Sequence, residues 1–192
     1  MKAYALRMLL AVLLVPCGWQ SAIAKECAGV GFPDQVQADG ASLTLNGLGL
    51  RLATLLKVKV YVGALYVAKP ATDAAAILGS NGPYELVLHF VRNVGADDLR
   101  KGWDEGFEKN AGAQLPALKD RIATLNGWMA DVKSGQKLTF TQKPGRGVQV
   151  NVAGNVKGTI SGDDFAKVFL SIWLGNPPND EIKVGLLGGA CG

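Results

Sequence analysis

The sequence predicts an α+β domain in which a large antiparallel sheet is covered on one face by helices. Strand-like segments precede and follow a block of two successive amphipathic helices. Helices that follow each other directly favour an αα-hairpin packed on an antiparallel sheet over a parallel α/β fold. Hydrophobic residues make up 48% of the 192-residue chain and charged residues 19%, a balance that supports one sizeable core and disfavours disorder.

The first 24 residues are predicted to be a secretory signal peptide. Lys2 and Arg7 precede the apolar run MLLAVLLVP, and Ala22-Ile23-Ala24 has the A-x-A form of a cleavage site. The apolar run is too short to span a bilayer, so no stable membrane anchor is expected. Cleavage after Ala24 would release a periplasmic or secreted chain, in which residues 25–192 form a single domain.

The charge pattern disfavours a nucleic-acid partner. Removal of residues 1–24 takes away two basic residues and no acid, so the formal net charge falls from +4 to +2. Basic residues are also interspersed with acids, as in Asp97-Asp98 followed by Arg100-Lys101. Binding to nucleic acid needs a basic patch, and a nearly neutral, mixed surface does not provide one.

Cysteine usage predicts a disulfide rather than a metal site. Cys27 and Cys191 lie at opposite ends of the expected mature chain, and an exported protein meets an oxidising compartment. The single histidine, His89, has no cysteine or acid at ligand spacing and is interpreted as structural. Gly47-Leu48-Gly49 lacks the third glycine of a nucleotide-binding fingerprint, so neither a cofactor nor a metal is expected.

The first half of the chain is predicted to be mostly strands. Residues 32–37 and 42–45 flank Ala38-Asp39-Gly40, which is typical of a hairpin turn. A long strand at 57–68 ends before Pro70, with Val58, Val60 and Val62 expected on one face and Lys57, Lys59 and Tyr61 on the other. A short helix at 71–78 and a strand at 84–92 complete this half.

The second half begins with the two helices. One opens at Asp97 and carries an apolar stripe through Trp103, with Gly102 and Gly106 spaced to let another element approach closely. The next begins near Pro116, and its stripe is Leu118, Ile122, Leu125, Met129 and Val132. The elements that follow are strands at 137–142, 146–152 and 156–160 and helices at 162–174 and 180–187, with Ser161 as the expected N-cap of the first helix and Asp164 at its N3 position.

Three blocks resemble the bacterial chalcone isomerase-like proteins: LTLNGLGLR…KVYVGALYV, ELVLHFVRNVGADDLRKGWDEGFEKN and GTISGDDFAKVFLSIWLGNPP. Their order and spacing cover nearly all of residues 28–188. The resemblance implies an open-faced β-sandwich, with a ligand cleft between a large antiparallel sheet and a helical layer.

The resemblance implies two different functions for that cleft. Plant chalcone isomerases catalyse an intramolecular ring closure, whereas their plastid relatives bind fatty acids and lack the activity. In both, an arginine after the Gly-x-Gly-x segment is the central polar group, and it matches Arg51 here. In the binding relatives this arginine pairs with a carboxylate, helped by a tyrosine that matches Tyr61, where the enzyme has a threonine.

Other positions that resemble the enzyme's site have changed. The enzyme uses a tyrosine just after its next long strand, where this chain reads Asn93-Val94-Gly95. The positions in this sequence nearest to the enzyme's helical asparagine are Gly102 and Trp103. Its polar position on the late helix falls at Ser171 or Ile172. The arginine is therefore kept, while much of the ketone-binding network is missing.

The chemistry of Arg51 fits a ligand anchor without the resemblance. A guanidinium stays charged and presents a fork that matches a carboxylate. An unpaired charge in an apolar cleft is costly, so it needs an anionic or strongly polar partner. The alternative is an internal acid, such as Glu85 or Asp104, as the partner of Arg51.

Three functions remain open from the sequence. The preferred hypothesis is an exported protein, not an enzyme, that binds a fatty acid or another small apolar anion, such as a phenolic compound, at Arg51, Tyr61 and Ser171. The alternative is an intramolecular lyase of the chalcone isomerase type that uses Arg51 and Tyr61. The third is a structural or accessory protein whose cleft is filled by its own side chains. The sequence does not indicate the oligomeric state.

Overall fold

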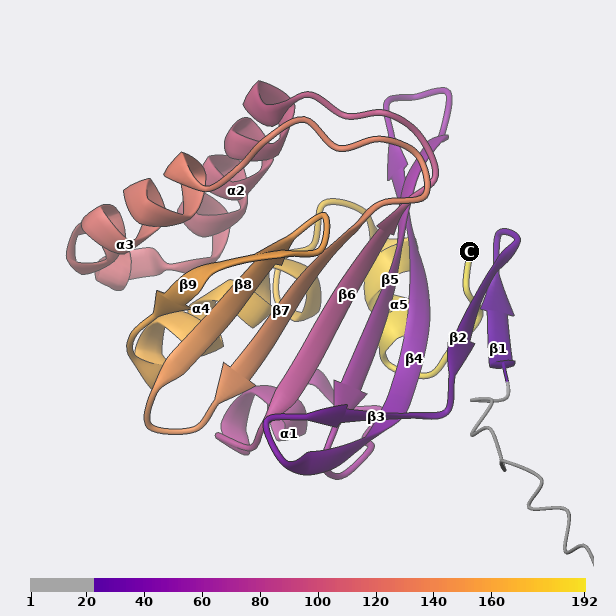
Figure 1. The fold of residues 1–192 in the computed structure, drawn as a ribbon, viewed down its shortest axis with the longest axis horizontal. Coiled ribbons are helices and arrows are strands. Elements are labelled where there is room, and N and C mark those ends of the chain that lie inside the picture. The colour runs from indigo at the N-terminus through magenta and orange to yellow at the C-terminus, as the bar shows by residue number, and fades with distance from the viewer. Residues whose placement is uncertain (1–22) are drawn as a thin grey trace, which may run out of the picture.

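The body of the protein is a seven-stranded antiparallel sheet with helices packed against it (Figure 1). The structure is a computed structural model that describes residues 23–192, so almost all of the predicted signal peptide lies outside the described residues. The strands are β1 (Ile23–Cys27), β2 (Val30–Pro33), β3 (Gln35–Ala38), β4 (Ala41–Ala53), β5 (Val58–Val67), β6 (Tyr84–Phe90), β7 (Lys137–Lys143), β8 (Gly147–Val152) and β9 (Asn155–Ile160). The helices are α1 (Ala74–Gly79), α2 (Ala96–Asn110), the 3₁₀ turn η1 (Gly112–Gln114), α3 (Leu115–Gly127), α4 (Asp163–Leu174) and α5 (Asp180–Leu186).

The strands lie in the sheet in chain order, from β3 to β9. Each therefore pairs with its sequence neighbour in antiparallel register, and the predicted α+β class is confirmed. The predicted hairpin is present: Ala38 pairs with Ala41 across Asp39-Gly40, whose φ angles of 50° and 82° suit a two-residue turn. β4 is longer than the pattern predicted and runs on to Ala53.

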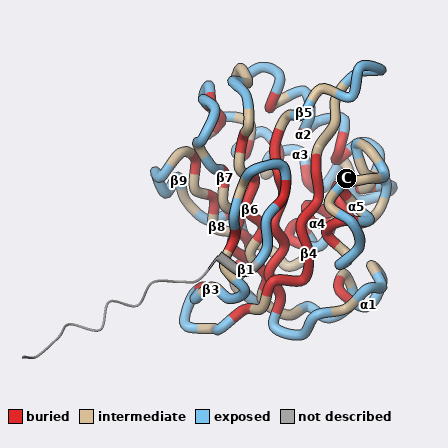
Figure 2. The backbone as a smooth tube through the Cα atoms, turned by 90° about the vertical axis from the view of Figure 1, so that its right-hand side faces the viewer, coloured by how far each residue is buried: buried red, intermediate tan, exposed pale blue. Residues whose placement is uncertain are grey.

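The main core lies between the sheet and the helical layer. Burial runs along the central strands, whereas the connecting loops are exposed (Figure 2). Aromatic rings from α2, β7 and α4 interlock there: Phe169 packs 4.6 Å from Phe140 and 5.1 Å from Trp173, centroid to centroid. Gly106 of α2 lies against Ile172 of α4, which confirms the close approach predicted at this glycine, whereas a Cβ at Gly102 would meet no described atom within 4 Å, so the prediction is wrong there.

A second, smaller core lies on the other face of the sheet. The β1–β2 ribbon covers it, and Phe32 packs there with outward-facing residues of the central strands. Cys27 and Cys191 form a disulfide with a Cα–Cα separation of 5.9 Å, so the predicted pairing is present in the structure. The bridge ties the end of β1 to the C-terminal segment, where the Cys191 carbonyl accepts a hydrogen bond of 3.0 Å from Leu50 N.

The Gly47-Leu48-Gly49 segment serves helix packing. A Cβ at Gly47 would overlap the Gly185 carbonyl oxygen, and a Cβ at Gly49 would overlap that of Ile182. In turn, a Cβ at Gly185 would overlap the backbone of Leu48. α5 therefore lies backbone to backbone on β4, a distance that only glycine permits.

The predicted cap of the late helix is wrong. The N-cap residue of α4 is Gly162, with a φ of 101°, and it makes no side-chain cap. Asp164 instead forms paired hydrogen bonds of 2.8 and 2.7 Å with Arg121 of α3. A charge-assisted pair between helices replaces the local capping box, because the fork of the guanidinium matches both carboxylate oxygens.

Candidate functional site

A pocket of about 530 Å³ opens between β4, β5 and β6 on one side and α2 and α4 on the other. This size is within the range of small-ligand sites. Its walls are mainly apolar, and the aliphatic part includes Val60, Val94, Leu99 and Ile172. The cleft expected from the sequence is therefore open rather than filled by the protein's own side chains.

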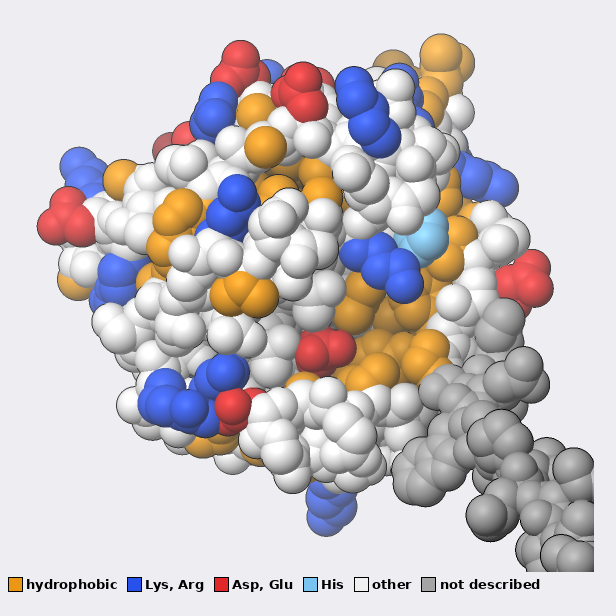
Figure 3. All heavy atoms as spheres, in the orientation of Figure 1, with side chains coloured by type: hydrophobic (Ala, Val, Ile, Leu, Met, Phe, Trp, Pro, Cys, Tyr) orange, Lys and Arg blue, Asp and Glu red, His pale blue; other side chains and the backbone are white. Residues whose placement is uncertain are grey.

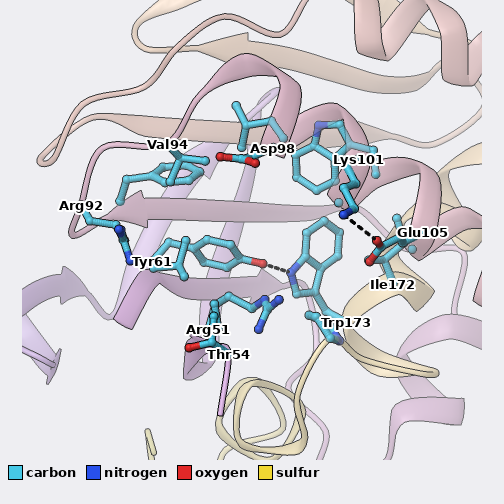
Figure 4. Close-up of a pocket in the computed structure, with 18 of the residues that line it drawn as sticks. Arg51, Thr54, Tyr61, Arg92, Val94, Asp98, Lys101, Glu105, Ile172 and Trp173 are labelled. Atoms are coloured by element: carbon cyan, nitrogen blue, oxygen red, sulfur yellow. Dashed lines mark hydrogen bonds and ion pairs between the residues drawn. The ribbon is translucent and has the colours of Figure 1, made fainter. Parts of the chain in front are cut away.

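Arg51 lies in this pocket at the end of β4 (Figure 4). Its Nη1 donates to the Leu52 carbonyl oxygen and, at 3.4 Å, to Oδ1 of Asn179. No carboxylate of residues 23–192 lies within ion-pair distance of it. Within the described residues, this charged fork thus faces the pocket with neutral partners only.

The internal acids suggested as partners for Arg51 are engaged elsewhere. Glu85 accepts a hydrogen bond of 2.9 Å from Thr141, and burial raises the pKa of its carboxyl. Asp104 accepts one of 2.7 Å from Asn126. The alternative that Arg51 is a structural ion-pair residue is contradicted by these contacts.

Tyr61 also lines the pocket, beside Arg51 in the sheet register. Its phenolic oxygen accepts a hydrogen bond of 3.0 Å from Nε1 of Trp173 on α4. An indole N–H can only donate, so the Tyr61 hydroxyl keeps its own hydrogen for another acceptor. Burial raises the pKa of Tyr61, and the Trp173 bond and the charge of Arg51 offset this only in part, so the phenol is neutral.

One expectation about Tyr61 was wrong. Strict alternation put it on the face opposite Val58, Val60 and Val62, but Val60 lines the same pocket as Tyr61. The β4–β5 register shifts between Arg51 and Leu52, which leaves Val60 as an extra residue in β5. Such a bulge interrupts alternation and turns two successive side chains towards one face.

The late helix presents Ile172 and Trp173 to the pocket rather than Ser171. The Ser171 hydroxyl donates a hydrogen bond of 2.6 Å to the Val168 carbonyl of the preceding turn. Ser171 does not line the pocket, so its position does not support the ligand-binding role expected for it. Of the two residues that the sequence left open, Ile172 is the one at the site.

Sequence reasoning missed Asn179, which holds the Arg51 end of the pocket. Its Oδ1 accepts a hydrogen bond of 3.2 Å from Leu52 N, and its Nδ2 donates one of 3.1 Å to the Leu50 carbonyl. Asn179 occupies the N-cap position of α5 but makes no capping hydrogen bond. An asparagine just after Pro177-Pro178 suggests a local cap, so no sequence signal indicated a link to β4.

Two tryptophans were likewise not assigned to the site. Trp173 positions the Tyr61 hydroxyl, as described above. Trp103 lines the pocket and packs edge-on against Trp173, with ring centroids 5.8 Å apart. Its Nε1 is buried and has no acceptor among residues 23–192.

Charged side chains from α2 complete the rim (Figure 4). Lys101 lies 4.0 Å from Glu105, and Asp98 projects from the first turn. Arg92, after β6, is exposed and has no carboxylate within 4.0 Å among the described residues. The lining as a whole carries more cations than acids, which favours an anionic ligand.

His89 has no place in this pocket. It lies on the other face of the sheet, edge-on to Phe32 at 6.3 Å between ring centroids. Burial lowers its pKa, with a further contribution from Lys137. Among residues 23–192, no group of three histidine, cysteine or acidic side chains is placed to hold a metal ion.

The chain belongs to the chalcone isomerase-like family, whose model matches residues 24–188. Among solved structures it is similar to a fatty-acid binding protein of Arabidopsis thaliana, with a TM-score of 0.62 and 17% sequence identity. That similarity covers 83% of this chain and 92% of the Arabidopsis chain, and at this identity it shows a shared fold. No curated protein matches this chain.

No helix in the described part of the chain combines the length and the apolar character needed to cross a membrane. Over the face drawn in Figure 3, basic and acidic side chains are interspersed.

Proposed function

We propose that this protein binds a fatty acid or a similar apolar anion, with the carboxylate held by Arg51 and Tyr61. The observation that carries the proposal is the state of Arg51: within residues 23–192 its guanidinium has only neutral partners, beside a neutral phenol, in a largely apolar pocket. A ligand carboxylate would supply the missing counter-charge and accept from both groups.

The apolar part of the pocket fits the rest of such a ligand. An acyl chain would lie against the aliphatic and aromatic walls formed by β5, β6, α2 and α4. Its transfer from water contributes about 0.8 kcal/mol for each buried CH₂ group. The fatty-acid binding protein of the same fold supports this ligand class.

The proposal treats the protein as a binder and not as a lyase. The positions that resemble the enzyme's ketone-binding tyrosine and asparagine carry other residues, and Val94, Gly102 and Trp103 line the pocket there. An arginine alone can stabilise an oxyanion, but ring closure also needs the reacting groups held in position.

Calorimetric titration tests the binding function. Fatty acids are expected to bind in a 1:1 ratio, and the methyl ester of the same acid is expected to bind more weakly because it lacks the charge. Equal affinity for acid and ester would contradict a carboxylate anchor. Stereoselective chalcone cyclisation well above the spontaneous rate, lost in Arg51→Ala, would assign the pocket to the lyase.

We further propose that the protein is exported, with a mature chain that starts at Lys25. The support is the basic and apolar leader that ends at Ala22-Ile23-Ala24. N-terminal sequencing of exported material checks this. A chain that starts at Met1, or one acylated at Cys17, would contradict it.

A further inference from the structure

The hairpin tip between β4 and β5 exposes two adjacent leucines. Leu55 is 102% exposed and Leu56 is 86% exposed. The other large apolar side chains that are exposed within residues 23–192, Val156 at 60% and Val184 at 53%, stand singly. A tight turn facing water usually carries glycine, asparagine or aspartate, so a leucine pair at this position needs a different explanation.

The tip has a defined conformation. Lys57 N donates a hydrogen bond of 3.1 Å to the Thr54 carbonyl and closes the turn. Thr54 and Lys57 both have positive φ angles, 62° and 51°, and a β-branched residue such as threonine adopts this region only at a cost. The turn thus holds both leucines away from the body of the protein.

The leucine tip is continuous with the wall of the ligand pocket. Ala53 and Thr54, immediately before it, line the pocket, and so do Val60 and Tyr61 on the following strand. Figure 1 shows the tip at the end of the sheet where α2 begins. A surface that received the leucines would therefore lie beside the pocket.

The residues around the tip are basic. Lys57 and Lys59 follow the leucines, and Arg92 lies on the pocket rim. Lys57 is paired with Glu181 at 3.0 Å, whereas Lys59 and Arg92 are exposed and have no carboxylate within 4.0 Å among the described residues. In an anionic bilayer, hydrocarbon lies below a layer of negatively charged headgroups. Apolar side chains at the tip, with cations behind them, match this arrangement.

We propose that the Thr54–Lys57 tip docks reversibly on an anionic phospholipid bilayer. The leucines enter the acyl region while Lys59 and Arg92 remain at the level of the phosphates. A bilayer fits the tip better than another protein does, because cations lie behind the leucines and because the tip adjoins the pocket wall. The consequence, transfer of a fatty acid between bilayer and pocket, rests on the proposed function, whereas docking itself does not.

Vesicle flotation tests the docking. The protein is expected to float with phosphatidylcholine vesicles that contain phosphatidylglycerol, less with pure phosphatidylcholine, and less as salt increases. The double variant Leu55→Ser/Leu56→Ser is expected to bind at least about tenfold more weakly, because two apolar side chains are lost from the interface. Val156→Ser/Val184→Ser removes exposed apolar surface elsewhere and is the matched control, expected to float like the parent.

Fatty-acid titration without vesicles separates the two proposals. Leu55 and Leu56 do not line the pocket, so the double serine variant should bind fatty acid like the parent. Vesicle binding that depends on the leucines, without fatty-acid binding by the parent, would support docking and contradict the proposed function. The docking alone would be overturned if the parent binds fatty acid but does not float with vesicles. It would also be overturned if the parent binds fatty acid and the double serine variant floats as well as the parent does.

A second copy of this chain is the competing occupant of the tip. Sedimentation velocity over a range of protein concentrations measures it. Self-association that the double serine variant abolishes, in a protein that does not float with vesicles, would assign the tip to a dimer and overturn the proposal. A parent that stays monomeric and floats would support it.

Discussion

Nε1 of Trp173 donates a 3.0 Å hydrogen bond to the phenolic oxygen of Tyr61, joining α4 to β5 at the base of the pocket. The two residues are 112 positions apart in the chain. The bond fixes the orientation of the phenol and occupies one acceptor site on its oxygen. The Tyr61 hydrogen is consequently left to donate next to Arg51, so two donors converge on one region of an apolar pocket.

Substitution of Arg51 should affect charged ligands most. Arg51→Ala is expected to weaken fatty-acid binding about tenfold or more, because a hydrogen bond to a charged group is worth about 1.5–3 kcal/mol. Arg51→Lys should fall between the parent and Arg51→Ala, since a point charge replaces a fork. Calorimetry with an acid and its methyl ester measures this. An unchanged affinity of Arg51→Ala for the acid would refute the anchor.

The Tyr61–Trp173 pair should behave as a unit. Tyr61→Phe is expected to cost less affinity than Arg51→Ala, about 0.5–1.5 kcal/mol, because one neutral donor is lost. Trp173→Phe should weaken binding through the loss of phenol orientation, and the double variant should lose less than the sum of the two. A double-mutant cycle by calorimetry measures the coupling, and strict additivity would contradict a positioning role for Trp173.

The proton of Tyr61 should not limit binding at ordinary pH. Its pKa is raised above the usual value near 10, so the phenol remains a donor throughout the neutral range and titrates only at higher pH. Affinity for a fully ionised ligand, such as an alkyl sulfonate, is expected to be flat between about pH 6 and 9. A loss of affinity in this window that Tyr61→Phe removes would show a phenol with a lowered pKa.

Gly49→Ala should damage both stability and the site. The new Cβ would overlap the Ile182 carbonyl and force α5 away from β4, with a cost of about 1–3 kcal/mol or more. Because Asn179 at the start of α5 bonds to β4, ligand affinity should fall as well. Thermal unfolding and calorimetry measure both effects. Gly127→Ala, where a Cβ meets nothing within 4 Å, is the control, and equal stability of the two variants would contradict this packing.

Loss of the Cys27–Cys191 bridge should destabilise the chain without changing the pocket lining. The bridge spans 164 residues, and its removal in Cys27→Ser/Cys191→Ser is expected to cost about 2–5 kcal/mol, largely by freeing the unfolded chain. Chemical denaturation with and without reductant measures it. The reductant should lower the stability of the parent to that of the double serine variant, and a parent that is indifferent to reductant would contradict the bridge.

The sequence alone predicted most of the strands and helices, because their signals are local. Alternation predicted the long strand from residue 57, apolar stripes predicted the two helices that begin near Asp97 and Pro116, and Asp39-Gly40 predicted the turn of the hairpin between β3 and β4. The two cysteines at the chain ends predicted the disulfide. A guanidinium between a glycine-spaced segment and an apolar strand also drew attention to Arg51, since a lone charge in apolar surroundings is conspicuous in any sequence.

Only the tertiary structure decided how the site is assembled. The bulge at Val60 is set by the register in which β4 and β5 pair. The link from Asn179 to β4 and the bond from Trp173 to Tyr61 join residues 127 and 112 positions apart. The close packing of Gly47 and Gly49 on α5 is of the same kind. A local sequence pattern predicts on which face of its strand or helix a side chain lies. The residue that this side chain contacts in another element is fixed by the global packing, and a one-residue shift in register is enough to change that contact.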